Sequence, residues 1–158
     1  MKLYHASNLE VRHPTLVESN RMLDFGSGFY TTTNREQAVR FAKSVVVKRG
    51  GSPVLNTYEF DETGFEACLL RKFDGATAAW LDFVAENRAG KYVGVKYDLI
   101  FGPVANDNVY STVLLYLRGF MSREATIAEL KVHKLCDQLV FATPQAFRFL
   151  KFIGSEAL

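Results

Sequence analysis

The chain of 158 residues carries 19 basic and 17 acidic residues, and this near balance argues against a protein that depends mainly on contacts to nucleic-acid phosphates. Hydrophobic residues make up 48% and charged residues 23%, which is typical of a globular domain and excludes a fibrous or disordered chain. We expect one domain over residues 1–158. Because no apolar run approaches the ~18 residues of a membrane-spanning helix and no signal peptide is evident, we expect a cytoplasmic protein. Two cysteines and three histidines lack metal-ligand spacing, so no metal site is predicted, and both thiols are expected to be reduced and buried.

The first half of the chain predicts three strands, a long loop and one helix. β-Branched and aromatic residues indicate strands over residues 2–6, 28–32 and 53–60, and a loop is expected over residues 7–24. Asn34 followed by Gln37 is a capping-box pattern, which opens a helix that ends near Lys48, before two glycines. The spacing places four residues on its buried face: Ala38, Phe41, Ala42 and Val45.

The second half predicts helices that alternate irregularly with strands. A helix over residues 76–87 is expected to bury Ala79, Trp80, Phe83 and Val84. A strand over residues 97–102 precedes two further helices, one containing Val109 to Leu117 and one capped by Ser122. The final strand is expected over residues 138–142, followed by a C-terminal helix from Thr143-Pro144 to about Ile153. These elements predict an α+β fold and not a doubly wound one.

The segment from Asp24 to Thr32 contains the glycine pair Gly26 and Gly28. A strand follows this turn, whereas the phosphate-binding turns of nucleotide-binding folds open a helix. Small residues permit close approach of a ligand to the backbone, and they recur beside His5, at Ala6 and Ser7. Aromatic rings hold a flat cationic ring by stacking, which suits Tyr30 and Phe41. His5 is expected to donate a hydrogen bond to a ligand hydroxyl while remaining neutral.

Through these residues, in this order, the chain resembles the His-Tyr-Glu branch of the ADP-ribosyltransferase superfamily, which includes the poly(ADP-ribose) polymerases. The resemblance implies split mixed sheets with a cleft for NAD, the substrate. It implies NAD-binding positions at His5, Ala6, Ser7, Gly28, Tyr30, Thr31 and Phe41. Catalytic positions are implied at His5, Tyr30, Gln138 and Asp107.

Gln138 stands where the branch has its glutamate, in the segment Asp137-Gln138-Leu139. A neutral amide stabilises positive charge less than a carboxylate does, so chain elongation is not expected, whereas transfer of a single ADP-ribose is compatible with it. Asp107 has two interpretations: it supplies the missing carboxylate, or it caps the following helix together with Asn106.

Nearly the whole chain is also similar to a family of small bacterial proteins of unknown function that is assigned to this superfamily, in which the segments Asp24 to Thr32 and Gly102 to Asp107 recur. Such genes often look like the toxin half of a toxin-antitoxin pair, which implies an antitoxin partner. The resemblance therefore implies a mono-ADP-ribosyltransferase that acts on a macromolecular acceptor or on water.

Three alternatives remain open from the sequence. A module that binds NAD, ADP-ribose or a protein without catalysis fits the missing glutamate. An enzyme that modifies nucleic acid requires a basic surface leading to the cleft. Taken singly, His5, Tyr30 and Phe41 are more typical of core residues than of ligand contacts, and Gln138 also fits a surface position.

Overall fold

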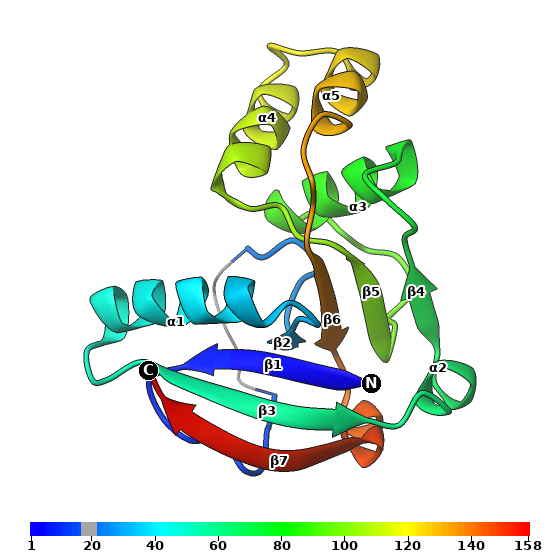
Figure 1. Ribbon diagram of the computed structural model, residues 1–158. Coiled ribbons are helices and arrows are strands. Elements are labelled where there is room, and N and C mark those ends of the chain that lie inside the picture. The colour runs from blue at the N-terminus through cyan, green and yellow to red at the C-terminus, as the bar shows by residue number, and fades with distance from the viewer. Residues whose placement is uncertain (17–21) are drawn as a thin grey trace.

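Two small β-sheets form the centre of the protein in the computed structural model, which describes residues 1–16 and 22–158 (Figure 1). Sheet A is antiparallel throughout, and its strands in spatial order are β1 (Lys2–Ser7), β3 (Val54–Phe60) and β7 (Leu150–Ala157). Sheet B contains, in spatial order, β2 (Phe29–Thr31), β6 (Asp137–Phe141), β5 (Leu99–Pro103) and β4 (Leu70–Lys72). The pair β4 and β5 is parallel, whereas β2–β6 and β5–β6 are antiparallel. An isolated bridge between Tyr4 and Thr32 joins β1 to the end of β2.

The helices lie on two sides of these sheets. Helix α1 (Arg35–Arg49) runs along sheet A, and α2 (Gly64–Ala67) follows β3 (Figure 1). On the side of sheet B away from sheet A lie three helices: α3 (Ala78–Arg88), α4 (Asp107–Leu117) and α5 (Arg123–Leu130). A 3-10 helix, η1 (Pro144–Phe149), connects β6 to β7. No helix of the described ranges has both the length and the apolar content to cross a membrane.

Sheet B is covered on both faces because its side chains alternate between two apolar clusters. Val140 packs toward α3 to α5 in the cluster that includes Trp80, whereas Phe29 and Phe141 pack toward sheet A in the cluster that includes Tyr58. Successive side chains of a strand point to opposite faces, which accounts for this division. The fold class is therefore α+β, as the sequence predicts.

The predicted helix starts are confirmed by their caps. The side chains of Asn34, Asn106 and Ser122 accept hydrogen bonds from the backbone three residues on, at 2.9, 3.1 and 3.1 Å. These bonds satisfy donors that a helix start leaves free. Helix α1 ends at Gly50, whose φ of 74° suits glycine. The reciprocal bond expected of the capping box is replaced, because Gln37 Oε1 accepts from the hydroxyl of Thr32 instead.

The predicted C-terminal helix is wrong. After one 3-10 segment the chain forms β7, which pairs with β3 and completes sheet A, so β6 is not the last strand. In β7 the half-buried Leu150 and Phe152 alternate with the exposed Lys151 and Ile153, which is the period of a strand. The sequence reading also missed α2 and β4, whose three or four residues carry little periodic signal.

Two assignments of buried helix faces are also wrong. Phe41 is 57% exposed, because α1 is buried through the small residues Ala38 and Ala42. Ala79 is exposed on α3, while Trp80 is fully buried. Successive helix positions are rotated by about 100°, so a neighbour in sequence lies on a different face. Both thiols are free, but only Cys68 of the two is buried.

Candidate functional site

His5 lies where the two sheets meet. Its ring stacks on Phe29 with centroids 4.2 Å apart, and its Nδ1 lies 2.7 Å from the carbonyl oxygen of Tyr30. The bridge between Tyr4 and Thr32, with N···O distances of 2.8 and 3.0 Å, holds β1 beside β2 at this point. The structure therefore brings the ring of His5 to the backbone of Tyr30, whereas the side chain of Tyr30 lies on the other face of sheet B.

The hydrogen bond of His5 fixes its tautomer. A carbonyl oxygen only accepts, so Nδ1 carries the proton and donates it to Tyr30, and Nε2 of the neutral ring is an acceptor. Burial is the main cause that lowers the pKa of His5 to about 4; the nearby charge of Arg49 lowers it further, and the bond to Tyr30 opposes the shift. In this tautomer the proton of Nδ1 is used within the protein, and at neutral pH the free ring nitrogen Nε2 accepts. Contact between His5 and a ribose hydroxyl stays a prediction.

The hydroxyl of Tyr30 belongs to the glycine turn. It donates to the carbonyl oxygen of Gly26 at 2.7 Å and accepts from the backbone nitrogen of Phe25 at 3.1 Å. Burial raises the pKa of Tyr30 above its usual value, so the hydroxyl keeps its proton. Tyr30 thus ties the turn to β2, and its ring packs against the apolar cluster that includes Trp80.

The glycines of the turn are explained by contacts within the protein. Gly26 has φ +77°, a conformation that favours glycine. A Cβ added to Gly28 would lie 2.5 Å from Cγ1 of Val140 and 2.9 Å from the carbonyl oxygen of Phe141. Gly28 therefore permits β2 to approach β6. The sequence suggested another reason for this glycine, namely access of a ligand to the backbone.

Gln138 is 5% exposed and lies in a polar cluster with Asp24 and Arg88. Its Nε2 donates to Oδ2 of Asp24 at 3.3 Å and to the carbonyl oxygen of Pro103 at 3.2 Å. Asp24, which is 4% exposed, also accepts from the backbone nitrogen of Ala105 at 3.0 Å. The alternative of a surface position for Gln138 is wrong.

Arg88 closes this cluster from α3. Its Nε and Nη2 lie 2.6 and 2.5 Å from Oδ1 of Asp24, and its guanidinium lies 4.2 Å from the ring centroid of Tyr110 on α4. The cluster thus joins the glycine turn, α3, α4 and β6. Sequence analysis missed the role of Asp24, although this residue begins the motif, because its partner is 64 positions away.

The other predicted site residues lie on β1, β2, α1 and α4. Ala6 is half-buried on β1, and the buried Ser7 accepts from the backbone nitrogen of Leu9 at 3.3 Å. The hydroxyl of the buried Thr31 donates to the carbonyl oxygen of Leu139 at 2.7 Å. Phe41 presents an exposed ring on α1. Asp107 is the first residue of α4, and Asn106 is its N-cap; the side chain of Asp107 lies outside the described part.

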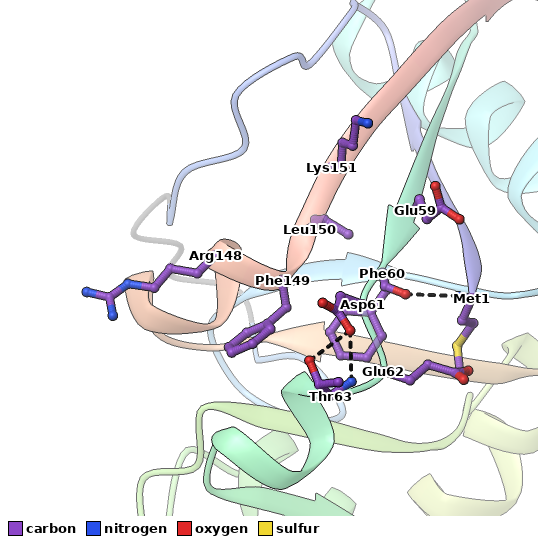
Figure 2. Close-up of a pocket in the computed structure, with 10 residues that line it drawn as sticks. All are labelled: Met1, Glu59, Phe60, Asp61, Glu62, Thr63, Arg148, Phe149, Leu150 and Lys151. Atoms are coloured by element: carbon purple, nitrogen blue, oxygen red, sulfur yellow. Dashed lines mark hydrogen bonds between the residues drawn. The ribbon is translucent and has the colours of Figure 1, made fainter.

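A hollow of about 620 Å³ lies beside the end of β3 and η1, away from these residues (Figure 2). Some of its polar groups bond locally: Asp61 accepts from the backbone nitrogen and hydroxyl of Thr63 at 3.0 and 2.8 Å, and the amino group of Met1 donates to the carbonyl oxygen of Phe60. Arg148 extends away from the hollow (Figure 2). None of the predicted site residues lines it, so it is not the candidate site.

Replacing Gly28 by alanine is expected to lower the free energy of unfolding by about 2 kcal/mol, the cost of overpacking a filled site. The new methyl group would meet Val140 and the backbone of β6. Urea denaturation checks this, with Gly154→Ala on β7 as the matched strand control, because a Cβ at Gly154 meets nothing within 4 Å. Equal stability of the two variants would contradict the packing role of Gly28.

The comparisons with known proteins identify a family but no function. No curated protein and no solved structure matches the chain. A family model described as "Protein of unknown function (DUF3990)" matches residues 1–152. Since this match covers nearly the whole sequence, the chain belongs to the DUF3990 family.

Proposed function

We propose that this protein is an NAD-dependent mono-ADP-ribosyltransferase, which cleaves the bond between nicotinamide and ribose and transfers ADP-ribose to a macromolecular acceptor. One observation carries the proposal: His5, Tyr30 and Gln138 lie on β1, β2 and β6, which are neighbours in that order. Tyr30 pairs with Val140, so Tyr30 and Gln138 lie on the same face of their strands. The ring of His5 stacks on Phe29, whose side chain points to the other face of β2. An ADP-ribosyltransferase-like cleft for NAD between the two sheets is part of the proposal.

In the proposed reaction the bond between the ribose carbon and the ring nitrogen breaks, and its electron pair leaves with nicotinamide. The nucleophilic atom of the acceptor bonds to the same carbon and releases its proton to water. Because positive charge develops on the ribose, hydrogen-bond acceptors that orient its hydroxyls assist the reaction. Nε2 of His5 and the amide oxygen of Gln138 are the two acceptors that we assign to this role.

The remaining assignments follow the resemblance. The rings of Tyr30 and Phe41 are proposed to hold nicotinamide, the exposed position of Phe41 being compatible with an open side of the site. Asp107 remains a candidate acid or base. The acceptor, an antitoxin partner and a cytoplasmic location remain predictions, and a nucleic acid is among the possible acceptors.

A second function is favoured by the burial of Gln138. Since the residue is only 5% exposed and its side-chain nitrogen is bonded to Asp24, it also fits a purely structural role. The second candidate is therefore a module that binds NAD, ADP-ribose or a protein without catalysis. It predicts that NAD raises the melting temperature of the protein while no nicotinamide is released.

The proposal is tested by incubating the protein with NAD and measuring free nicotinamide. His5→Gln places an amide oxygen near the position of Nε2, whereas His5→Asn places an amide nitrogen near the position of Nδ1. We expect His5→Asn to lower kcat/KM for NAD about tenfold or more, as for a lost acceptor, and His5→Gln to lower it less.

His13→Asn is the matched control, because His13 is exposed and has no assigned role. Its rate is expected to equal that of the unaltered protein. Absence of both nicotinamide release and thermal stabilisation by NAD would refute the proposal. Equal rates in His5→Asn and the control would remove His5 from the mechanism.

A further inference from the structure

The orientation of the Gln138 amide is determined by its two neighbours. Oδ2 of Asp24 and the carbonyl oxygen of Pro103 lie 3.3 and 3.2 Å from its Nε2. Both neighbours only accept hydrogen bonds, so the group between them must be the NH2 group. An amide turned by 180° would place its oxygen against two oxygens and lose both bonds.

The charge of the cluster is also determined. Asp24 accepts two hydrogen bonds from Arg88 and one each from Ala105 and Gln138, all of which favour the ionised carboxylate. The side chains of Asp24 and Arg88 are 5% and 21% exposed. The negative charge near position 138 is therefore already present, and it belongs to Asp24.

We propose that Asp24 is a positioning residue that sets the chemistry of position 138: it holds the amide nitrogen of Gln138, leaves the amide oxygen as the atom that meets a ligand, and excludes a second carboxylate. The ligand part of this inference rests on the proposed function, with the ribose of NAD as the ligand. This arrangement accounts for a glutamine at the position where the enzymes that the chain resembles have a glutamate.

A glutamate at position 138 would have no hydrogen to donate to Asp24 or Pro103. Two buried carboxylates at hydrogen-bond distance do not both ionise, so the pair would retain a proton at neutral pH. Among the described residues, the other charged or titratable groups of the cluster are Arg88 of α3, Tyr30 of β2 and Tyr110 of α4. None of these side-chain types changes charge between pH 5 and 8, so a titration in this range belongs to the carboxylate pair.

The first test is urea denaturation of Gln138→Glu between pH 5 and 8. Because the folded pair holds a proton that the unfolded chain releases, the stability of this variant relative to the unaltered protein is expected to fall as the pH rises. Gln145→Glu is the control, because it makes the same change at an exposed position. The double variant Asp24→Asn with Gln138→Glu is expected to lose the pH dependence, since only one carboxylate remains.

The second test measures nicotinamide release at pH 7.5. We expect Gln138→Glu to be no faster than the unaltered protein, and the double variant, whose single carboxylate is free to ionise, to exceed Gln138→Glu about tenfold. The same pH dependence of stability in Gln138→Glu and Gln145→Glu would overturn the inference. Faster release by Gln138→Glu alone would overturn it as well.

These outcomes separate the inference from the proposed function. Denaturation needs no NAD, so it decides whether Asp24 holds position 138 even if NAD is not the substrate. Absence of nicotinamide release from every variant, without thermal stabilisation by NAD, would refute the proposed function and with it the ligand-facing role of the amide oxygen.

Discussion

Lowering the pH from 7.5 to 4.5 is expected to remove about 2.5 kcal/mol of folding stability through His5 alone. The pKa of His5 is lowered to about 4 in the folded protein, from 6.5, chiefly by burial. Between these values the unfolded chain binds a proton that the folded ring does not. The contribution of His5 to the folding stability is therefore complete above about pH 6.5, falls as the pH decreases, and is lost below about pH 4.

His5→Asn isolates this contribution, because its amide nitrogen can still donate to Tyr30 but does not titrate. We expect the free energy of unfolding, measured in urea at both pH values, to fall by about 2.5 kcal/mol less in the variant than in the unaltered protein. The lowered pKa values of Glu10 and Asp61 contribute equally to both proteins and cancel. Parallel loss in both proteins would show that His5 does not resist protonation.

The sequence predicts best those features that depend on neighbours in the chain. Asn34, Asn106 and Ser122 cap helices because each bonds to a backbone nitrogen three residues on, which spacing alone reveals. The strands at His5, Tyr30 and Gln138 were predicted from their own composition, and the structure confirms them. Whether these segments form helices or strands is therefore determined by residues that are close together in the sequence.

The sequence predicts less well what depends on distant partners. Phe147, Leu150 and Ile153 recur at helical spacing, and only pairing with β3, about 90 residues earlier, makes the last segment a strand. The hydrogen bonds within the site are also non-local. The order of the motifs predicts that His5 lies near Tyr30. It does not reveal that Nδ1 of His5 donates to the carbonyl oxygen of Tyr30, or that Asp24 accepts a hydrogen bond from Gln138.

Replacing Asp24 by alanine is expected to lower the free energy of unfolding by about 3 kcal/mol, at the lower end of the range for breaking a buried ion pair because Arg88 is 21% exposed. The substitution leaves three donors without this acceptor: the Arg88 guanidinium, the Ala105 backbone nitrogen and the Gln138 amide. Urea denaturation at pH 7.5, well above the range in which His5 titrates, measures the loss.

Asp82→Ala provides the matched control. Asp82 also forms an ion pair with an arginine, Arg123, but both side chains of this pair are more than a third exposed. Its loss is expected to be below about 1 kcal/mol. The difference between the two variants measures what burial adds. If Asp24→Ala lowers the free energy of unfolding no more than Asp82→Ala does, the cluster of Asp24, Arg88 and Gln138 does not hold α3, α4 and β6 together. Asp24 would then not determine the orientation of the Gln138 amide.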